Sequence, residues 1–407
     1  MAKFALPKSA SNLRIVPDSR LDLRPEEEIL AELRSFRPIK SEKNVWAFWD
    51  KGLDAIYPSY KCTVVNWVRK LGPSWTIRIV DLVEGSPNNI YNYVGKNWFP
   101  DCFINQTMDG KHAAQHAADL ARLPLLFEHG GLWMDVGNML HTHLDRLFWD
   151  ALTAPDSPYE MAAWMITGQI RKQWGSFGNY MLAARKGCIF IKNWHNGYKE
   201  LWKNKSKADG FHQLPLMKDI GLAEGMADWN FKDKIREMSD YVAHMLIGDR
   251  TRNLLDLETG WNGREFFENK VFMVEGIFNG VLGAIKTDYD GYKQVELFTT
   301  PLDETDANKR QAAEAFMVEM LENSHMYKVY HNSAGGLPAL GDLIKKEEYR
   351  DSTQRPNTFG ELYRYGTIHW ESTRGIQRLT PQLSGEELIQ GSPIMPATRN
   401  AGSSNRM

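Results

Sequence analysis

Four polar side chains recur at helical spacing inside a segment that is otherwise made of small and apolar residues. His112, Gln115, Asp119 and Arg122 fall on one line of a predicted helix over residues 111–128. Stripes of alanine and leucine on both sides of this line favour burial of the helix. A buried helix with one polar line usually faces a cleft or a polar partner. The spacing leaves open a second interpretation, an ordinary i,i+3 pair of Asp119 and Arg122 on a solvated face.

An acidic residue near the end of a short apolar strand is the second candidate for chemistry. Gly130 fits the left-handed position that ends a helix, and residues 132–136 are predicted to form a buried strand that carries Asp135 near its carboxyl end. That end of a parallel sheet is where α/β proteins bind ligands. A carboxylate there suits a hard divalent cation that bridges to phosphate oxygens. Because a buried carboxylate without a partner is costly, we expect a cation or a basic side chain beside Asp135.

Alternating strands and helices are expected to position these residues. Strands are predicted at 45–49, 75–80, 132–136, 161–166 and 180–184, and helices at 57–71, 88–94, 111–128, 189–201 and 308–323. This alternation predicts an α/β fold with a mostly parallel sheet covered on both faces.

The chain is expected to have three parts. Residues 1–43 are predicted to be an N-terminal arm with a short helix, and residues 44–345 the main domain, with a mainly helical insertion at about 205–300 that covers the site. Residues 346–407 are predicted to be a C-terminal extension, largely disordered after about 380 because the tail is rich in Pro, Ser, Gly and Asn.

Residues 112–140 resemble the sugar-binding DXD region of GT-A glycosyltransferases, and most of all the capsular polysaccharide synthesis and family 32 type. Residues that match the family pattern in order and spacing are Asp119, Arg122, Gly130, Gly131 and Asp135. Residues 45–52 are similar to the first strand of the family, residues 176–184 to a segment centred on Asn179, and residues 239–246, more weakly, to another. The resemblance covers roughly residues 44–250 and implies a Rossmann-like GT-A fold with helical insertions.

What the resemblance implies about function is specific. The protein would transfer a hexose from a UDP- or GDP-sugar to a hydroxyl of a small-molecule or glycan acceptor, with retention of the anomeric configuration. The implied catalytic residues are Asp119, Arg122 and Asp135. The implied contacts to the nucleotide sugar come from Trp46, Phe48, Trp49, Asp119, Arg122 and Asn179, with the aromatic rings packed against the base.

A divalent cation, Mn²⁺ or Mg²⁺, is also implied, with Asp135, Asn138 and His331 as its expected ligands. Gly137 stands where the second acidic residue of the motif is expected, so the amide oxygen of Asn138 or water would fill that place. His369 ranks behind His331 as an additional ligand, and for either residue a surface or hydrogen-bonded histidine is the commoner role. His141 and His143, with Asp145, lack a third ligand at motif spacing and are expected to lie in a solvated turn.

The composition excludes several other functions. The formal net charge is −2 and no long Lys/Arg run occurs, which argues against nucleic-acid binding. No run of about 18 apolar residues could span a membrane, the N-terminus lacks a signal-peptide pattern, and three widely spaced cysteines favour a reducing compartment, so we expect a cytoplasmic protein. One alternative is an inactive sugar-nucleotide-binding or scaffold protein on the same fold. A nicotinamide oxidoreductase using Gly276, Gly280 and Gly283 is disfavoured, because their spacing is not GxGxxG.

Overall fold

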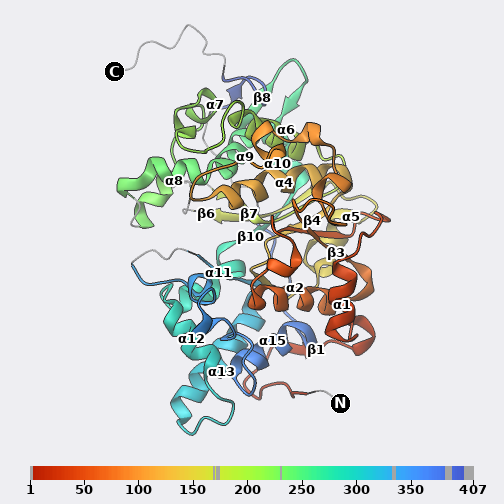
Figure 1. Cartoon of the computed structure of the whole chain (residues 1–407), viewed down its shortest axis with the longest axis vertical. Helices are drawn as coiled ribbons and strands as arrows, with labels where there is room; N and C mark the ends of the chain where they lie inside the picture. Colours follow the sequence, from red (N-terminus) through yellow and green to blue (C-terminus); the bar gives the residue numbers. More distant parts are fainter. Residues whose placement is uncertain are drawn as a thin grey trace.

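A six-stranded mixed sheet runs through the middle of the molecule (Figure 1). The computed structural model describes residues 3–167, 170, 175–229, 232–331, 336–380 and 387–397. The strand order is β10 (Val271–Glu275), β6 (Met161–Thr167), β7 (Gly175–Ala184), β4 (Gly131–Met134), β2 (Asn44–Phe48) and β3 (Thr76–Val80). All neighbours are parallel except β7, which is antiparallel to both β6 and β4. The predicted α/β fold with a mostly parallel sheet is confirmed.

Helices cover both faces of this sheet, as Figure 1 shows. On one side lie α4 (Ala113–His129), α6 (Ile189–Leu201), α9 (Ala243–Asn253) and α10 (Gly263–Lys270). On the other side lie α1 (Glu26–Leu33), α2 (Pro58–Leu71), α11 (Ile277–Lys286), α12 (Gly291–Thr299), α13 (Ala307–Asn323) and α15 (Phe359–His369). The predicted helix at 88–94 is only a single turn, Ile90–Asn92. Asn88 and Asn89 bind nearby backbone groups through their side chains, which favours a turn over a helix.

The two glycines between α4 and β4 are required by the backbone. Gly130 and Gly131 have φ angles of 67° and 106°, a region that L side chains rarely adopt. A Cβ at Gly131 would lie 2.3 Å from the carbonyl oxygen of Asn44 on β2. The glycine pair therefore lets the chain leave a helix and enter the centre of the sheet within two residues.

A second, two-stranded sheet continues from the end of β4. Its strands are β5 (Asn138–Leu140) and β11 (Met326–Lys328), which are antiparallel and pair Asn138 with Lys328. This pairing brings a segment from late in the sequence next to the chain that follows Asp135.

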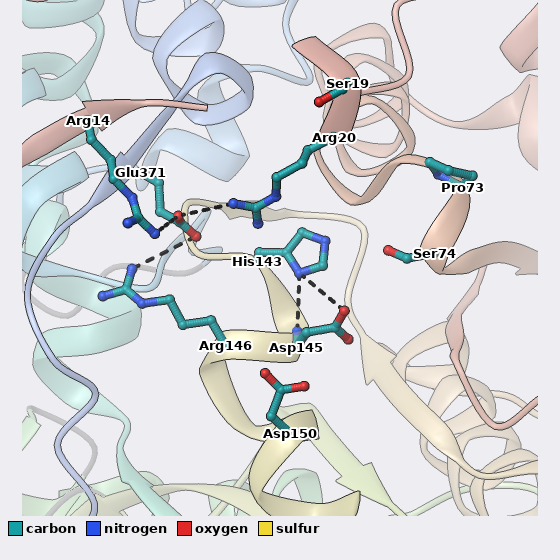
Figure 2. Close-up of a pocket in the computed structure, with 10 residues that line it drawn as sticks. All are labelled: Arg14, Ser19, Arg20, Pro73, Ser74, His143, Asp145, Arg146, Asp150 and Glu371. Carbon is teal, nitrogen blue, oxygen red and sulfur yellow. Dashed lines mark hydrogen bonds and ion pairs between the residues drawn. The ribbon is translucent and has the colours of Figure 1, made fainter. Parts of the chain in front are cut away.

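The N-terminal arm and the C-terminal extension meet. Strand β1 (Leu13–Ile15) pairs with β12 (Trp370–Ser372), and beside them lies a cavity of about 420 Å³ (Figure 2). The buried carboxylate of Glu371 forms ion pairs with three arginines that approach from different elements, Arg14 at 2.7 Å, Arg20 at 3.8 Å and Arg146 at 3.8 Å. These contacts tie the arm to the main body.

The turn at residues 141–143 differs from the expectation. His141 and His143 are buried and not solvated. His141 contacts the Tyr363 hydroxyl at 2.6 Å, and His143 lines the cavity of Figure 2.

The inserted region and the tail also differ in part from the expectation. The insertion is mainly helical, but it also contributes β10 to the main sheet. In the extension, β13 (Ile389–Gln390) pairs with β8 (Leu254–Asp256). The buried Arg250 guanidinium donates to the carbonyl oxygens of Ser392, Pro393 and Met395, which orders a segment that composition alone marks as disordered. Residues 381–386 and 398–407 of the predicted disordered tail lie outside the described residues.

Candidate active site

Asp135 lies directly after β4, at the carboxyl end of the central strand. Its backbone N–H donates to the carbonyl oxygen of Tyr180 at 3.0 Å, and its Oδ1 accepts from the Trp133 indole at 3.0 Å. The Asp135 side chain is 35% exposed. The carboxylate is therefore held in place while one side of it remains open to a ligand.

Asp119 and Arg122 form a buried ion pair on α4. The Arg122 Nη2 lies 2.8 Å from Asp119 Oδ1, and the same oxygen accepts from Asn179 Nδ2 at 3.0 Å. Burial acts to raise the pKa of Asp119, but the positive charge of Arg122 holds that pKa below its ordinary value. The pair does have i,i+3 spacing, but it faces the site and not a solvated surface.

The donors of Arg122 are directed at protein groups. Nη1 donates to the carbonyl oxygen of Asn179 on β7, Nε donates to the Ala118 carbonyl at 3.4 Å, and the guanidinium lies 4.9 Å from the centre of the Trp133 ring. Nη2 is 4.0 Å from Asp135 Oδ1. Because Arg122 is buried and its donors are used by these protein groups, it positions Asp119 and β7. Its positive charge also acts on the nearby Asp135 carboxylate.

Asn179 joins the buried pair to the helical insertion. In addition to its bond with Asp119, its Nδ2 lies 3.3 Å from His244 Nδ1 on α9. Burial lowers the pKa of His244 to about 3, so this imidazole is neutral at physiological pH. The weakly similar segment at 239–246 is thus part of the same constellation as Asp119.

Lys328 is a residue of the site that the sequence did not single out. Its Nζ lies 3.3 Å from Asp135 Oδ2 and 4.4 Å from the centre of the Tyr180 ring. Burial lowers the pKa of Lys328, while the Asp135 carboxylate favours the ammonium form and opposes that lowering. The basic partner expected beside Asp135 is present, and it comes from β11 at a separation of 193 residues.

The three aromatic candidates on and after β2 lie in different surroundings. Trp46 is fully buried, and its indole donates to the Gly130 carbonyl at 3.0 Å. Phe48 is also buried. Trp46 differs from the expected contact with a nucleotide base, because a side chain without exposed surface contacts only protein, whereas base contact stays a prediction for Phe48, which is 7% exposed. Trp49 is partly exposed and packs edge-on against Tyr57 and Tyr60, so base stacking remains a prediction for Trp49.

The expected metal ligands do not fit a divalent cation. Asn138 Oδ1 has no hydrogen-bond partner among the described residues, which is chemically suitable, but Asn138 has no exposed surface. Both nitrogens of His331 are engaged, with the Tyr60 hydroxyl at 2.7 Å and with Asp342 at 3.2 Å. The neighbouring Asn332 lies outside the described residues. Position 137 offers no side-chain ligand atom, and the Lys328 ammonium beside Asp135 would repel a second cation.

Two further observations concern metals and membranes. Within the described part of the chain, no group of three or more His, Cys, Asp or Glu side chains is placed to hold a metal ion. In the same residues no helix combines the length and apolar character that crossing a membrane requires. His369 stacks on Tyr365 at 4.0 Å in the last turn of α15.

Comparison with known proteins finds a matching family and relatives that align over nearly the whole chain. Among solved structures, the chain is similar to the PaToxG glycosyltransferase, with a TM-score of 0.32 and 12% identity over 55% of this chain and 82% of that one. Residues 26–252 match the capsular polysaccharide synthesis protein family. The chain is 34% identical to the O-glycosyltransferase braB of Annulohypoxylon truncatum, over 94% of its own length and 93% of that protein. It is 35% identical to the glycosyltransferase afumC of Aspergillus fumigatus, over 90% and 95%.

The family match and these two relatives, which align over nearly the whole chain, are sufficient for an assignment. The protein is a glycosyltransferase. It belongs to the capsular polysaccharide synthesis protein family.

Proposed function

We propose that the protein transfers a hexose from a UDP- or GDP-sugar to the hydroxyl of a small-molecule or glycan acceptor. The observation that supports this most is the cluster of Asp119, Arg122, Asn179 and Asp135 at the carboxyl end of β4, where α/β proteins bind ligands. Transfer to a hydroxyl is supported by relatives whose names describe O-glycosyltransferases.

The site suggests a role for each acidic residue. Asp119 Oδ1 accepts from Arg122 and Asn179, which leaves Oδ2, 3.6 Å from His116 Nδ1, to accept from a sugar hydroxyl and fix the anomeric carbon. Asp135 is the more exposed carboxylate and lies at the diphosphate end of the donor. The positive charges of Arg122 and Lys328 beside it offset the repulsion between this carboxylate and the diphosphate.

Transfer then requires stabilisation of charge more than covalent chemistry by the protein. The bond between the anomeric carbon and the diphosphate oxygen breaks, a bond to the acceptor oxygen forms, and the acceptor proton passes to the departing diphosphate. Positive groups aimed at the diphosphate lower the barrier because negative charge develops there. We propose retention of configuration, with attack from the face that the diphosphate leaves.

A donor screen tests this function. Purified protein is incubated with UDP-glucose, UDP-galactose or GDP-mannose, with Mn²⁺ or with EDTA, and free nucleoside diphosphate and hexose are measured by mass spectrometry. We expect slow hydrolysis of one donor. Calorimetry with the same donors measures binding: binding of no nucleotide sugar under either condition would contradict the proposal, and binding without any turnover would favour the inactive scaffold.

The role of Asp135 is tested with the donor so identified. Asp135→Asn should lower kcat about 100-fold, because the carboxylate holds the positive charge of Lys328 in place at 3.3 Å. The melting temperature should change little, because the side chain is partly exposed and the amide keeps its shape. Unchanged turnover in Asp135→Asn would refute the role proposed for this carboxylate.

We also propose a reducing compartment, the cytoplasm, for this protein. Cys62, Cys102 and Cys188 are all free thiols in the structure, and free thiols are typical of reducing compartments. Imaging of a fluorescent fusion checks this, and a signal confined to secretory organelles would contradict it.

A further inference from the structure

Lys328 and Asp135 occupy the place where the DXD motif would hold its cation. We propose that the Lys328 ammonium, and not a divalent metal ion, neutralises the departing diphosphate in this enzyme. This inference rests on the proposed function and deepens it by naming the group that meets the leaving group. It is carried by three observations: charge balance, free hydrogen-bonding capacity, and the space at position 137.

The net charge of the site is the same whether it holds a second carboxylate with a divalent cation or Lys328 alone. In a DXD site, the second carboxylate and a divalent cation together add one positive charge to the first carboxylate. Here the second carboxylate is absent at Gly137, and Lys328 adds one positive charge 3.3 Å from Asp135. The diphosphate would therefore meet the same net charge in both arrangements.

Lys328 also has hydrogen-bonding capacity that Arg122 lacks. An ammonium has three N–H donors, and among the described residues the Lys328 Nζ makes one hydrogen bond, to Asp135, and otherwise lies over the rings of Tyr180 and Tyr330. The Arg122 guanidinium is directed at Asp119, Asn179 and Ala118. Of these two cations, Lys328 is the one that can turn toward phosphate oxygens, since its side chain is 19% exposed.

Glycine at position 137 is not required by the fold. Its φ is not in the left-handed region, and a Cβ there would meet Tyr60 at 3.5 Å and Val329 at 3.6 Å, which are ordinary van der Waals distances. A Cβ could therefore be accommodated at this position, which lies beside the end of β11, where Gly137 accepts a hydrogen bond from Val329 at 3.0 Å. The absence of a second carboxylate at position 137 is thus not imposed by the space around its Cβ, and the nearby cation at this place is Lys328.

The first experiment compares Lys328→Met with the wild type after dialysis against EDTA. The probe is UDP-glucose or GDP-mannose, whichever the wild type hydrolyses. We expect the wild type to keep its activity in EDTA and Lys328→Met to lose about 100-fold in kcat, with no recovery on adding Mn²⁺. The control is Lys293→Met, which removes an exposed lysine paired with Asp288 and should leave kcat unchanged.

The second experiment reports on the site without turnover. Calorimetry in EDTA measures binding of UDP, GDP and the free nucleosides. Lys328→Met should weaken binding of the preferred nucleoside diphosphate at least tenfold and leave binding of the nucleoside unchanged. Circular dichroism melts establish that the variant is folded.

The third experiment restores the metal site. The double variant Gly137→Asp/Lys328→Ala should bind Mn²⁺ in the presence of UDP, measured by electron paramagnetic resonance, and its activity should need Mn²⁺. Gly137→Asp alone, which keeps Lys328, should bind Mn²⁺ at least tenfold more weakly than the double variant.

The outcomes separate this inference from the proposed function. Wild-type activity that disappears in EDTA and returns with Mn²⁺ overturns the inference and leaves the function intact. If no donor is hydrolysed under any condition, the proposed function fails, but the titrations with UDP and GDP still test the role of Lys328. The inference is overturned if wild type and Lys328→Met bind these diphosphates with equal affinity, or if neither diphosphate binds at all.

Discussion

Asp119 and Asp135 are both acidic, but their surroundings give them different tasks. The Asp119 side chain is 8% exposed and shares one oxygen between Arg122 and Asn179, whereas Asp135 is 35% exposed and contacts Lys328 and Trp133. A carboxylate that is almost fully enclosed by hydrogen-bond donors holds the surrounding side chains in place, whereas one that remains partly exposed can contact a ligand. Burial, not residue type, distinguishes the two.

Removing the charge of Asp119 should affect both activity and stability. Asp119→Asn keeps the shape but leaves the buried Arg122 without its closest counter-ion, so we expect a loss of about 3 kcal/mol in the free energy of unfolding. The loss of the sugar contact should lower kcat/KM about 100-fold. Urea denaturation and steady-state kinetics measure the two effects.

The matched control is Asp351→Asn. It breaks an Asp–Arg pair of similar geometry with Arg355 on the surface, and we expect a change within about 0.5 kcal/mol and unaltered kinetics. Equal effects of the two substitutions would show that burial of the Asp119–Arg122 pair has no consequence.

At the scale of elements, the close approach of the β4 backbone to β2 fixes the position of Asp135. Strand β4 begins at Gly131, packed against the Asn44 carbonyl, and its short length brings Asp135 to the edge of the sheet. The glycines at 276 and 283 have a related role in α11: a Cβ at Gly276 would lie 2.8 Å from the Met165 carbonyl, and one at Gly283 would lie 2.0 Å from the Tyr327 ring. They permit close packing of α11, which accounts for the glycine pattern without a dinucleotide.

Gly131→Ala should destabilise the protein far more than a comparable glycine substitution. Both positive φ and the 2.3 Å approach to Asn44 oppose a Cβ, so we expect a loss of about 4 kcal/mol or failure to fold. Gly187→Ala is the control, since Gly187 has a φ of 80° but open space around it, and it should cost about 1 kcal/mol. Equal melting temperatures for the two variants would contradict the packing argument.

At the scale of the whole molecule, buried histidines couple folding to pH. Burial lowers the pKa of His141 and His244 to about 3 and of His195 and His325 to about 4. His141 and His325 adjoin each other, and His195 and His244 lie on α6 and α9, so protonation opposes the folded state in two regions at once.

Stability should therefore fall as the pH drops below about 6.5, the ordinary pKa of histidine. Between that value and the lowered pKa values of the folded state, the unfolded chain binds more protons, so the free energy of unfolding rises with pH by about 1.4 kcal/mol per unit for each such histidine. Their contribution is fully present above pH 6.5 and is lost toward pH 4. Urea titrations at pH 7, 6 and 5 measure this slope.

A single substitution tests the assignment. His141→Gln removes one of the four histidines. Between pH 7 and pH 5 the free energy of unfolding of this variant should fall by about 2 kcal/mol less than that of the wild type. Lys293→Met, which removes an exposed lysine, should keep the wild-type slope. An unchanged slope in His141→Gln would mean that this histidine does not contribute.

Local patterns in the sequence were sufficient for the α/β fold, the family and the order of the central residues. Helical spacing put Asp119 and Arg122 on one line, and a glycine pair followed by an apolar strand put Asp135 at its carboxyl end. These inferences succeed because helix periodicity, capping and strand ends depend on residues that are close in sequence.

Only the tertiary structure decided which side chains surround these residues. Trp46 is enclosed in the core because its face of β2 packs against the end of α4, and the alternation of a strand does not say which face is covered. The ordering of residues 389–395 depends on the distant Arg250. Lys328 reaches Asp135 through the pairing of β5 with β11 across 193 residues, and such long-range pairing leaves no local pattern to detect.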